Sequence, residues 1–399
     1  MATITKRVWR NKGGKHQAWV VSYTDSEGNR HREQFGTKRL AEARRIDVEG
    51  QIKNGLYRAS AQTTTVEDAC RGYLTVLTKQ IERRERVPAY LDHEASCIWN
   101  YICPKPGRKT HFSGGISGIK LADLTARSVG SFRDRMRAGG RSVKGARRVI
   151  GTLTRVLGYA VSEDLVAVNV SRSVRVTGKR GEGSEKISPP SKEEFAALLS
   201  ACRNGFKVAV IFSAATAVRI SELFALTWSK LDLDNAEVHI DSRVDRKMNR
   251  DTTKSKAGLR TIPLARALVS TLRDWRCETQ FGEDFDLVFP NSLGKFQSQT
   301  NFRRRLFLPA QEEAKKAMAA EGKLYRRFGW HYVRHFAISL WIESGLSEKT
   351  VQTFAGHATL AMTMDLYGHL FPSKAHHKTM DTISAGLYPG YADLNPDSA

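Results

Sequence analysis

Cysteine is scarce in this 399-residue sequence. The five cysteines are Cys70, Cys97, Cys103, Cys202 and Cys277, and no two of them form a Cys-x-x-Cys motif. An odd number of cysteines without this spacing argues against a disulfide framework and against a zinc site. We therefore predict a protein of a reducing, cytoplasmic compartment that binds no metal.

Long hydrophobic runs are also missing. Stretches such as Phe206–Val218 are shorter than the ~20 apolar residues that cross a bilayer, and polar residues interrupt them. Met1–Arg7 carries charge, but no apolar segment follows as it would in a secretory signal. The sequence therefore predicts no membrane partner and no export.

Acidic residues are few relative to basic ones, at 41 against 64, so the net charge is +23. A charge excess of this size predicts a polyanionic partner, and nucleic acid fits best because basic side chains neutralise its phosphates. A merely solvated basic surface is the alternative. The 41% hydrophobic content supports packed cores, and the length suggests two or three domains.

Residues 1–60 are predicted to form a small β-rich module. Gln17–Tyr23 and Arg30–Phe35 are rich in strand-forming residues and flank a turn, and Thr37 can cap a helix that runs to Lys53. A β-ribbon with basic flanks can enter a DNA groove, although a structural cap with a solvated face would look similar. The candidate DNA contacts in this module are Arg30 and Arg32.

Residues 64–175 are predicted to form a helical domain. Thr64 and Glu67 have the spacing of a capping box, and helices are expected over residues 89–102, Thr125–Ala138 and Ser142–Ser162. The last of these helices is apolar on one face and basic on or beside the other, which suits contacts with phosphates. The candidate contacts are Lys144, Arg147, Arg148 and Arg155.

Apolar periodicity disappears over residues 176–190, which are rich in glycine and charge and are predicted to be a linker. Ser191 and Glu194 then form a capping box that opens a new helix. A further domain is predicted over residues 191–388, followed by a frayed tail over residues 389–399.

Three segments of this last domain carry candidate functional residues. Thr216–Trp228 places Arg219 at a turn between two apolar helices, where an arginine is often only an ion-pair partner. Thr253–Leu264 reads as a hairpin that follows the strand Glu237–Asp241, and it carries Lys254 and Lys256. A lysine at a hairpin tip is usually just solvated.

The third segment begins with His331 and Arg334, which are three residues apart and so share a helix face. Gly356 and His357 follow at the end of the next helix, and Tyr367 comes later. Arg334 and His357 are 23 positions apart, and His357 and Tyr367 are 10 positions apart.

Taken together, these boxes resemble the tyrosine site-specific recombinases of the phage integrase type, in both order and separation. The resemblance implies a multidomain, mainly α fold with small β-sheets. It would comprise an α+β catalytic domain, a helical, SAM-like core-binding domain and a β-rich module that binds arm-type DNA sites. Two positions depart from the family pattern. Ala217 stands where glycine is usual and could alter the turn that aims Arg219, because alanine adopts positive φ only at a cost; Ala355 replaces a leucine.

The resemblance implies that Tyr367 is the nucleophile, which forms a 3′-phosphotyrosyl link and frees a 5′-hydroxyl. It also implies that Arg219 and Arg334 clamp the phosphate, since guanidinium groups are permanently charged and donate in a fork. Tyr332, Tyr388 and Tyr391 are weaker nucleophile candidates.

His331 and His357 are expected to hydrogen-bond the phosphate, and His331 is the better candidate for proton transfer with the tyrosine. A hairpin lysine would protonate the leaving oxygen, with Lys254 preferred and Lys256 as the alternative. We expect His335 to be a packed or second-shell residue.

No cofactor is expected. One phosphoester replaces another, so the reaction needs no ATP, and the sequence contains no P-loop. His331 and His335 have helical metal-ligand spacing but lack the glutamate of His-Glu-x-x-His, and Glu222 is expected to be an ion-pair or capping partner.

The implied function is integration and excision of a prophage or other mobile element in the bacterial cytoplasm. The implied partners are double-stranded DNA attachment sites, three further copies in a homotetramer, and an accessory factor that bends DNA or sets direction. Residues 370–388 could dock on the same or a neighbouring protomer. The alternatives are a type IB topoisomerase, which would relax supercoils as a monomer, and a decayed integrase that binds DNA without cutting it.

Overall fold

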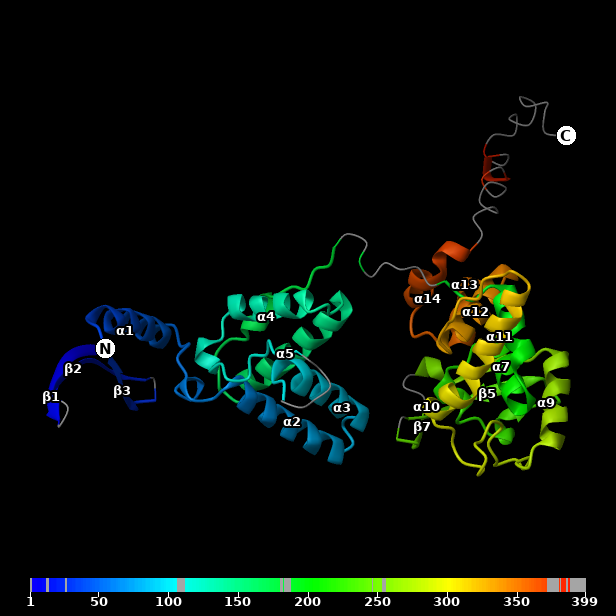
Figure 1. The fold of residues 1–399 in the computed structure, drawn as a ribbon, viewed down its shortest axis with the longest axis horizontal. Helices are drawn as coiled ribbons and strands as arrows, with labels where there is room; N and C mark the ends of the chain where they lie inside the picture. Colours follow the sequence, from blue (N-terminus) through cyan, green and yellow to red (C-terminus); the bar gives the residue numbers. More distant parts are fainter. Residues whose placement is uncertain are drawn as a thin grey trace. The chain divides into compact units, whose positions relative to one another are not determined.

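The computed structural model divides the chain into two compact units, an N-terminal unit (Met1–Glu185) and a C-terminal unit (Lys186–Ala399) (Figure 1). It describes residues 2–11, 14–25, 27–105, 112–179, 182, 188–245, 247–252, 256–371, 380, 382–384 and 387. The unit boundary falls within the predicted linker. No helix among the described residues is long and apolar enough to cross a membrane.

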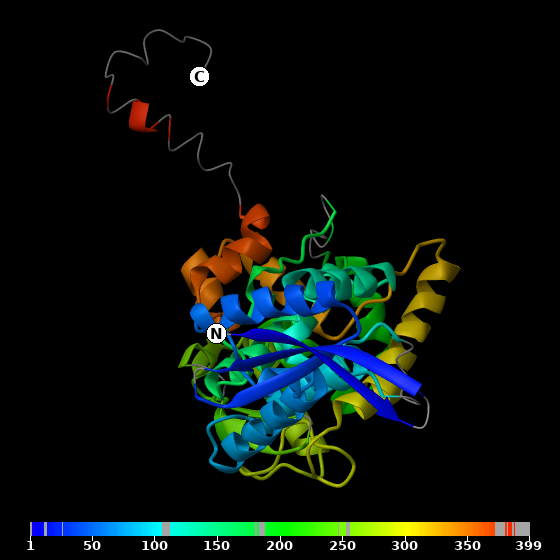
Figure 2. The same cartoon turned by 90° about the vertical axis from the view of Figure 1, so that its left-hand side faces the viewer.

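The N-terminal unit begins with an antiparallel sheet covered by one helix (Figure 2). Its strands are β1 (Thr3–Asn11), β2 (Gly14–Thr24) and β3 (Arg30–Phe35). Helix α1 (Lys38–Lys53) is capped by Thr37, as predicted, and buries Val48 against Val21 and Tyr23. The prediction omitted β1, because Lys6, Arg7 and Arg10 interrupt the apolar pattern that marks a strand.

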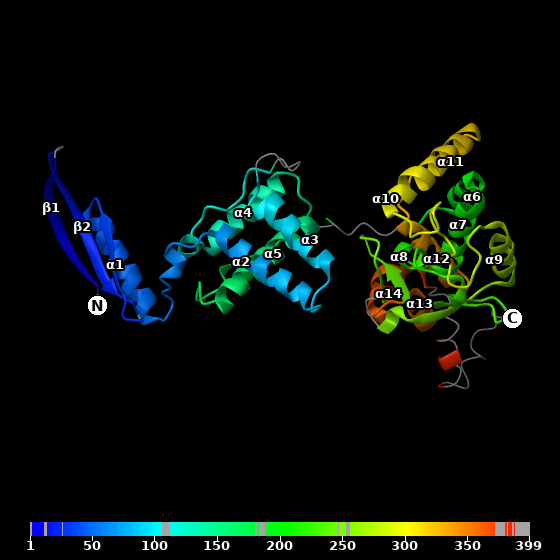
Figure 3. The same ribbon diagram turned by 90° about the horizontal axis from the view of Figure 1, so that it is seen from below.

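The rest of this unit is helical (Figure 3). Its main elements are α2 (Val66–Glu82), α3 (Pro88–Cys97) with a π-helical continuation over Ile98–Ile102, α4 (Ala126–Ala138) and α5 (Val143–Ser162). Helix α5 supplies much of the core, as its apolar face predicted. The capping box of α2 was predicted one residue too early, because Thr65 and Asp68 form it.

In its described residues, the C-terminal unit combines helices with two small antiparallel sheets. Its longer helices are α6 (Lys192–Ala201), α7 (Asn204–Thr216), α9 (Arg266–Glu278), α11 (Leu308–Ala320), α12 (His331–Glu343), α13 (Glu348–Ala355) and α14 (Leu360–Tyr367). One sheet has the order β4 (Leu231–Asp232), β5 (Glu237–Ile240), β8 (Arg260–Pro263), and the other pairs β6 (Ser242–Val244) with β7 (Arg250–Thr252). The predicted mainly α fold with small β-sheets is therefore confirmed.

Capping boxes and caps fix where the helices of this unit begin. Ser191 accepts a hydrogen bond from the Glu194 amide, and the Glu194 carboxylate accepts one from the Ser191 amide, as predicted. Ser347 caps α13, also as predicted. Tyr367, at the end of α14, packs in a small core with Ala217 and with apolar residues of α12 and α13. This core brings three distant parts of the sequence together.

Candidate active site

Arg219 follows a left-handed turn at the end of α7. Ala217 is buried and has φ 50° and ψ 25°, a conformation that costs an L-residue with a side chain ~1–2 kcal/mol. The sequence raised the expectation that alanine here could change the turn, but the structure keeps the left-handed conformation. The turn is held from outside, because the carbonyl oxygen of Ala217 accepts a hydrogen bond from the Arg334 guanidinium.

A buried ion-pair cluster orients Arg219. Glu222, in the short helix α8 (Ile220–Leu223), accepts from the Arg219 guanidinium at 2.8 Å and from the Arg260 guanidinium at 2.8 Å. Burial alone would raise the pKa of Glu222, but the charges of Arg260 and Arg219 hold it at about 2. Glu222 is therefore the ionised partner of both arginines, in the structural role that the sequence suggested.

Arg334 lies in the first turn of α12 with only 4% of its surface exposed. Its guanidinium donates to the carbonyl oxygens of Ala217 and Ala355, which end α7 and α13. Burial and the nearby charge of Arg219 lower the pKa of Arg334 to about 9, so it keeps its charge at neutral pH. Backbone carbonyl groups at the ends of α7 and α13 thus hold the Arg334 side chain in place.

Gly356 supplies a further helix-end carbonyl, which contacts Arg219. It ends α13 with φ 63°, and its carbonyl oxygen accepts from the second arm of Arg219 at 3.0 Å. A Cβ at this position would lie 3.0 Å from the Ala257 carbonyl oxygen and 3.0 Å from Nη1 of Arg260. Both the backbone conformation and the space therefore require glycine.

Alanine at Gly356 is expected to destabilise the C-terminal unit more than alanine at Gly345. Both glycines have positive φ, but a Cβ at Gly345 would meet nothing within 4 Å. Gly345→Ala should therefore cost only the ~1–2 kcal/mol of the left-handed conformation, while Gly356→Ala adds an overpacking cost of ~1–3 kcal/mol. Denaturant unfolding of both variants measures the difference, and equal losses would contradict the contact with Arg260.

The two candidate histidines have different surroundings. His331 lies at the start of α12 and is exposed. Partial desolvation of its imidazole, followed by the charges of Arg334 and Arg219, lowers its pKa. His357 is buried, and its Nδ1 lies 2.9 Å from the hydroxyl of Thr363. Burial and the surrounding arginines lower its pKa to about 4. Both imidazoles are therefore neutral at pH 7, and a neutral His331 can accept a proton.

Tyr367 is buried, with 1% of its surface exposed. Its ring stacks on that of His357, with centroids 6.4 Å apart, and its hydroxyl forms a short hydrogen bond with Nδ1 of His335. Burial raises the pKa of Tyr367 above its ordinary value, although Arg334 opposes the shift. Burial, followed by His331 and Arg334, lowers the pKa of His335 to about 4. Proton transfer from the phenol to His335 is thus strongly uphill, so this arrangement holds a neutral tyrosine at rest.

His335 has a more direct relation to the site than the sequence suggested. It lies one helical turn beyond His331, and their rings are 4.7 Å apart. The available signal was the spacing of four on a helix that already carried two candidate residues. That spacing does not show that the side chain meets a tyrosine 32 positions later.

Acidification is expected to destabilise the C-terminal unit between pH 6.5 and 4. His335 and His357 bind protons near pH 6.5 when unfolded but only near pH 4 when folded. The unfolded state therefore takes up more protons as the pH falls, and stability is lost over this window. Between pH 7.5 and 5 the loss should be about 2 kcal/mol for each histidine. Unfolding at both pH values tests this, and His335→Gln should reduce the pH dependence.

The other predicted site residues are distributed as follows. Lys254 lies outside the described residues, and Lys256 begins a short turn (Lys256–Gly258) whose first side chain is not described. Arg30 and Arg32 are exposed on β3, on the same sheet face since they alternate. Lys144, Arg147 and Arg148 are exposed on α5.

Arg155, the fourth predicted DNA contact on α5, pairs with an acidic residue of its own unit. Its guanidinium donates to both carboxylate oxygens of Glu94, at 2.9 and 2.7 Å, and Glu94 is fully buried. The fork that would hold a phosphate is therefore occupied by a carboxylate within the unit. Arg155 therefore compensates the buried charge of Glu94. Its side chain is still 42% exposed, so its contact with DNA stays a prediction.

Sequence relatives of this chain are found among the tyrosine recombinases. Residues 191–374 match the model of the phage integrase family. A tyrosine recombinase XerC-like protein of Caldanaerobacter subterraneus subsp. tengcongensis is 25% identical over 395 residues, 91% of this chain and 95% of that protein. The ICEBs1 integrase of Bacillus subtilis is 22% identical over 269 residues, 66% of this chain and 72% of that protein.

Solved structures share the fold. An integrase of transposon Tn1549, in complex with transposon right end DNA, aligns with a TM-score of 0.62 at 17% identity, over 81% of this chain and 100% of that chain. A lambda integrase tetramer bound to a Holliday junction aligns with a TM-score of 0.54 at 15% identity, over 88% of this chain and 95% of that chain.

The matched sequence model, the relatives and the fold together define a tyrosine site-specific recombinase, an enzyme class that transfers DNA strands through a tyrosine. Within that class, residues 191–374 match the phage integrase family.

Proposed function

We propose that this chain integrates, and also excises, a mobile element or prophage by site-specific recombination through a 3′-phosphotyrosyl DNA intermediate. The observation that carries the proposal is the meeting of three distant side chains at one place. Tyr367 packs in a core with Ala217 and Ala355, the Arg334 guanidinium donates to the carbonyl oxygens of those two alanines, and the ring of His357 stacks on that of Tyr367. The names of relatives support the biological setting, since they include the ICEBs1 integrase and a transposase of transposon Tn916.

In the proposed reaction, the phenol oxygen of Tyr367 forms a bond to the scissile phosphorus while the bond to the 5′-oxygen breaks. Arg219 and Arg334 stabilise charge on the non-bridging oxygens, and His357 donates a further hydrogen bond. His331 takes the phenol proton, and Lys254, with Lys256 as the alternative, protonates the leaving oxygen. The tyrosine must first leave its bond with His335, because that histidine is too weak a base to activate it.

The remaining assignments rest on family likeness and charge. We infer that residues 1–60 bind arm-type DNA through Arg30 and Arg32, and that residues 64–175 bind the core site through Lys144, Arg147 and Arg148. Residues 176–190 would link this part to the catalytic residues 191–388. Four copies would exchange strands between two duplexes, a state that a lambda integrase tetramer adopts on a Holliday junction. An accessory factor that bends DNA would complete the assembly.

The experiment that tests the function compares Tyr367→Phe with Tyr332→Phe. Random-sequence duplexes are incubated with the wild-type protein, and those that form denaturant-resistant covalent adducts are recovered and sequenced. Tyr367→Phe should bind the recovered duplex and form no adduct. Tyr332 is exposed on α12 and forms a matched control, so its variant should form adducts as the wild type does. Adducts from Tyr367→Phe would overturn the nucleophile, and relaxation of any plasmid without a second site would favour a topoisomerase.

A further inference from the structure

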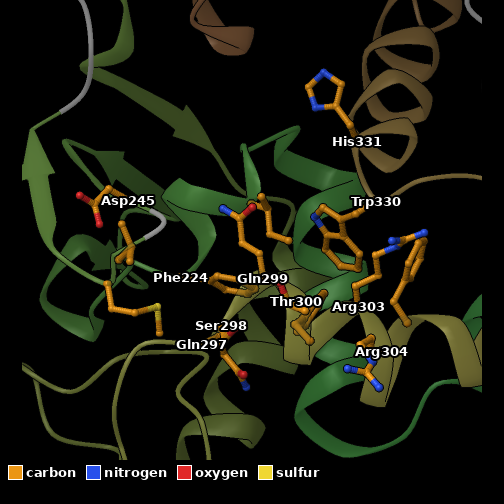
Figure 4. Close-up of a pocket in the computed structure, with 15 residues that line it drawn as sticks. Phe224, Asp245, Gln297, Ser298, Gln299, Thr300, Arg303, Arg304, Trp330 and His331 are labelled. Atoms are coloured by element: carbon orange, nitrogen blue, oxygen red, sulfur yellow. The ribbon is translucent and has the colours of Figure 1, made fainter. Parts of the chain in front are cut away.

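A recess of about 500 Å³ lies beside the candidate active site in the C-terminal unit (Figure 4). Its apolar floor contains Phe224, Phe302 and Trp330, whose rings pack edge to face with centroids 5.0 and 4.8 Å apart. These rings are fixed by the core of the unit, so the hollow is a preformed feature. Its volume falls within the range of cavities that take small-molecule groups.

The recess adjoins the residues that are proposed to hold the scissile phosphate. His331 lines it, and so does Ile220, which directly follows Arg219. Val244 and Met248, at the β6–β7 hairpin that precedes the candidate lysines, also line the recess. A DNA strand that is held by Arg219 and His331 would therefore pass this opening.

One rim of the recess is polar and basic. Helix α10 (Gln299–Phe302) contributes Gln299 and Thr300, and the π-helical turn η7 (Arg303–Phe307) contributes Arg303 and Arg304 (Figure 4). Both arginines are exposed, and their guanidinium groups form no ion pair or hydrogen bond with any residue that the structure describes. Such unpaired guanidinium groups are free to bind an external anion.

The one carboxylate of the lining does not neutralise these arginines. Asp245 accepts hydrogen bonds from the amides of Lys247 and Asn249, at 2.8 and 2.9 Å, and so stabilises the hairpin turn. The Asp245 carboxylate therefore binds backbone amides of its own turn. The guanidinium groups of Arg303 and Arg304, which also line the recess, remain available to bind an anion.

We propose that this recess binds the DNA strand beside the scissile phosphate. Arg303 and Arg304 bind the backbone phosphate that neighbours the cleavage point, and Gln299 and the apolar floor contact its sugar and base edge. This inference rests on the proposed function, and it adds a subsite that fixes the register of the strand. Phosphate contacts of this kind position DNA without specifying sequence, so the subsite sets where and how fast the cut occurs.

The decisive comparison is between Arg303→Gln/Arg304→Gln and Arg305→Gln. Arg305 is an exposed arginine in the same turn that does not line the recess, so it controls for net charge and for disturbance of the turn. The double variant should reduce the slope of log K against log salt by about 1, because the two arginines neutralise one phosphate and each neutralised phosphate contributes about 0.9. Its rate of adduct formation on a duplex recovered with the wild type should fall at least tenfold, while the rate of Arg305→Gln stays within about twofold of wild type.

Neutral methylphosphonate linkages, placed singly on either side of the cleavage point, identify the phosphate. The wild type should lose affinity at one neighbouring position, and the double variant should be insensitive at that same position. Adducts that form normally in the double variant, or an unchanged pattern of sensitivity, would overturn the inference and leave the proposed function standing. Failure of the wild type to form any adduct would instead overturn the proposed function and this inference with it.

Discussion

Glu222→Ala is expected to lower the free energy of unfolding of the C-terminal unit by about 3–5 kcal/mol. Glu222 is the carboxylate that pairs with Arg260, whose side chain is 1% exposed. Removing one partner of a buried pair leaves an uncompensated buried charge, and losses of this size are typical. The loss should exceed that from a surface pair several-fold.

Glu343→Ala is the matched control for this prediction. Glu343 pairs with Lys192 at 3.0 Å, but both side chains are more than half exposed, so the loss should stay below about 1 kcal/mol. Amide exchange of peptides from β8 and α8 reports the unit that carries Glu222 and avoids a two-state assumption for the whole chain. A loss below 1 kcal/mol in Glu222→Ala would show that water reaches and solvates Arg260.

The pair illustrates what sequence patterns can and cannot supply. A capping box such as Ser191 with Glu194 is a local signal, because both partners lie within one helical turn. Glu222 and Arg260 are 38 positions apart, and the tertiary packing of β8, which pairs with β5 and contacts α13, brings Arg260 to Glu222. Helix starts were therefore predictable from the sequence, whereas the pairing of Glu222 with Arg260 was not.

The same distinction between local and long-range signals explains which functional residues the sequence could predict. The order and separation of Arg334, His357 and Tyr367 predicted a site because a known family shares them, and no local rule would have done so. Arg155 was predicted from its basic helix face, but a helix pattern does not reveal that Glu94 lies opposite. The arginines of the recess were missed because three consecutive arginines look like a solvated surface until the adjoining cavity is seen.

Arg219→Lys is expected to reduce the rate of adduct formation by about 10²–10³ while leaving the fold intact. Arg219 uses one arm to reach Glu222 and another to reach the Gly356 carbonyl, and a guanidinium can keep those bonds while it presents further donors. Lysine retains the positive charge but cannot reproduce the planar fork, and the loss of one preorganised donor typically costs this much in rate.

Arg219 is a better test of the clamp than Arg334. Its side chain is 37% exposed, whereas Arg334 is buried and holds two helix ends, so a change at Arg334 would mix catalysis with stability. Arg273→Lys serves as the control, because Arg273 pairs with exposed Asp234 and contacts none of the site residues described above.

Affinity and rate should separate if Arg219 acts on the transition state. Charge on the non-bridging oxygens grows only as the tyrosine attacks, so the lost donor should reduce the single-turnover rate at saturating DNA and change Kd only slightly. Single-turnover adduct formation over a range of protein concentrations measures both quantities. A variant that lost affinity tenfold or more but kept its saturated rate would place Arg219 in ground-state binding, and the transition-state clamp would then reduce to Arg334 with the histidines.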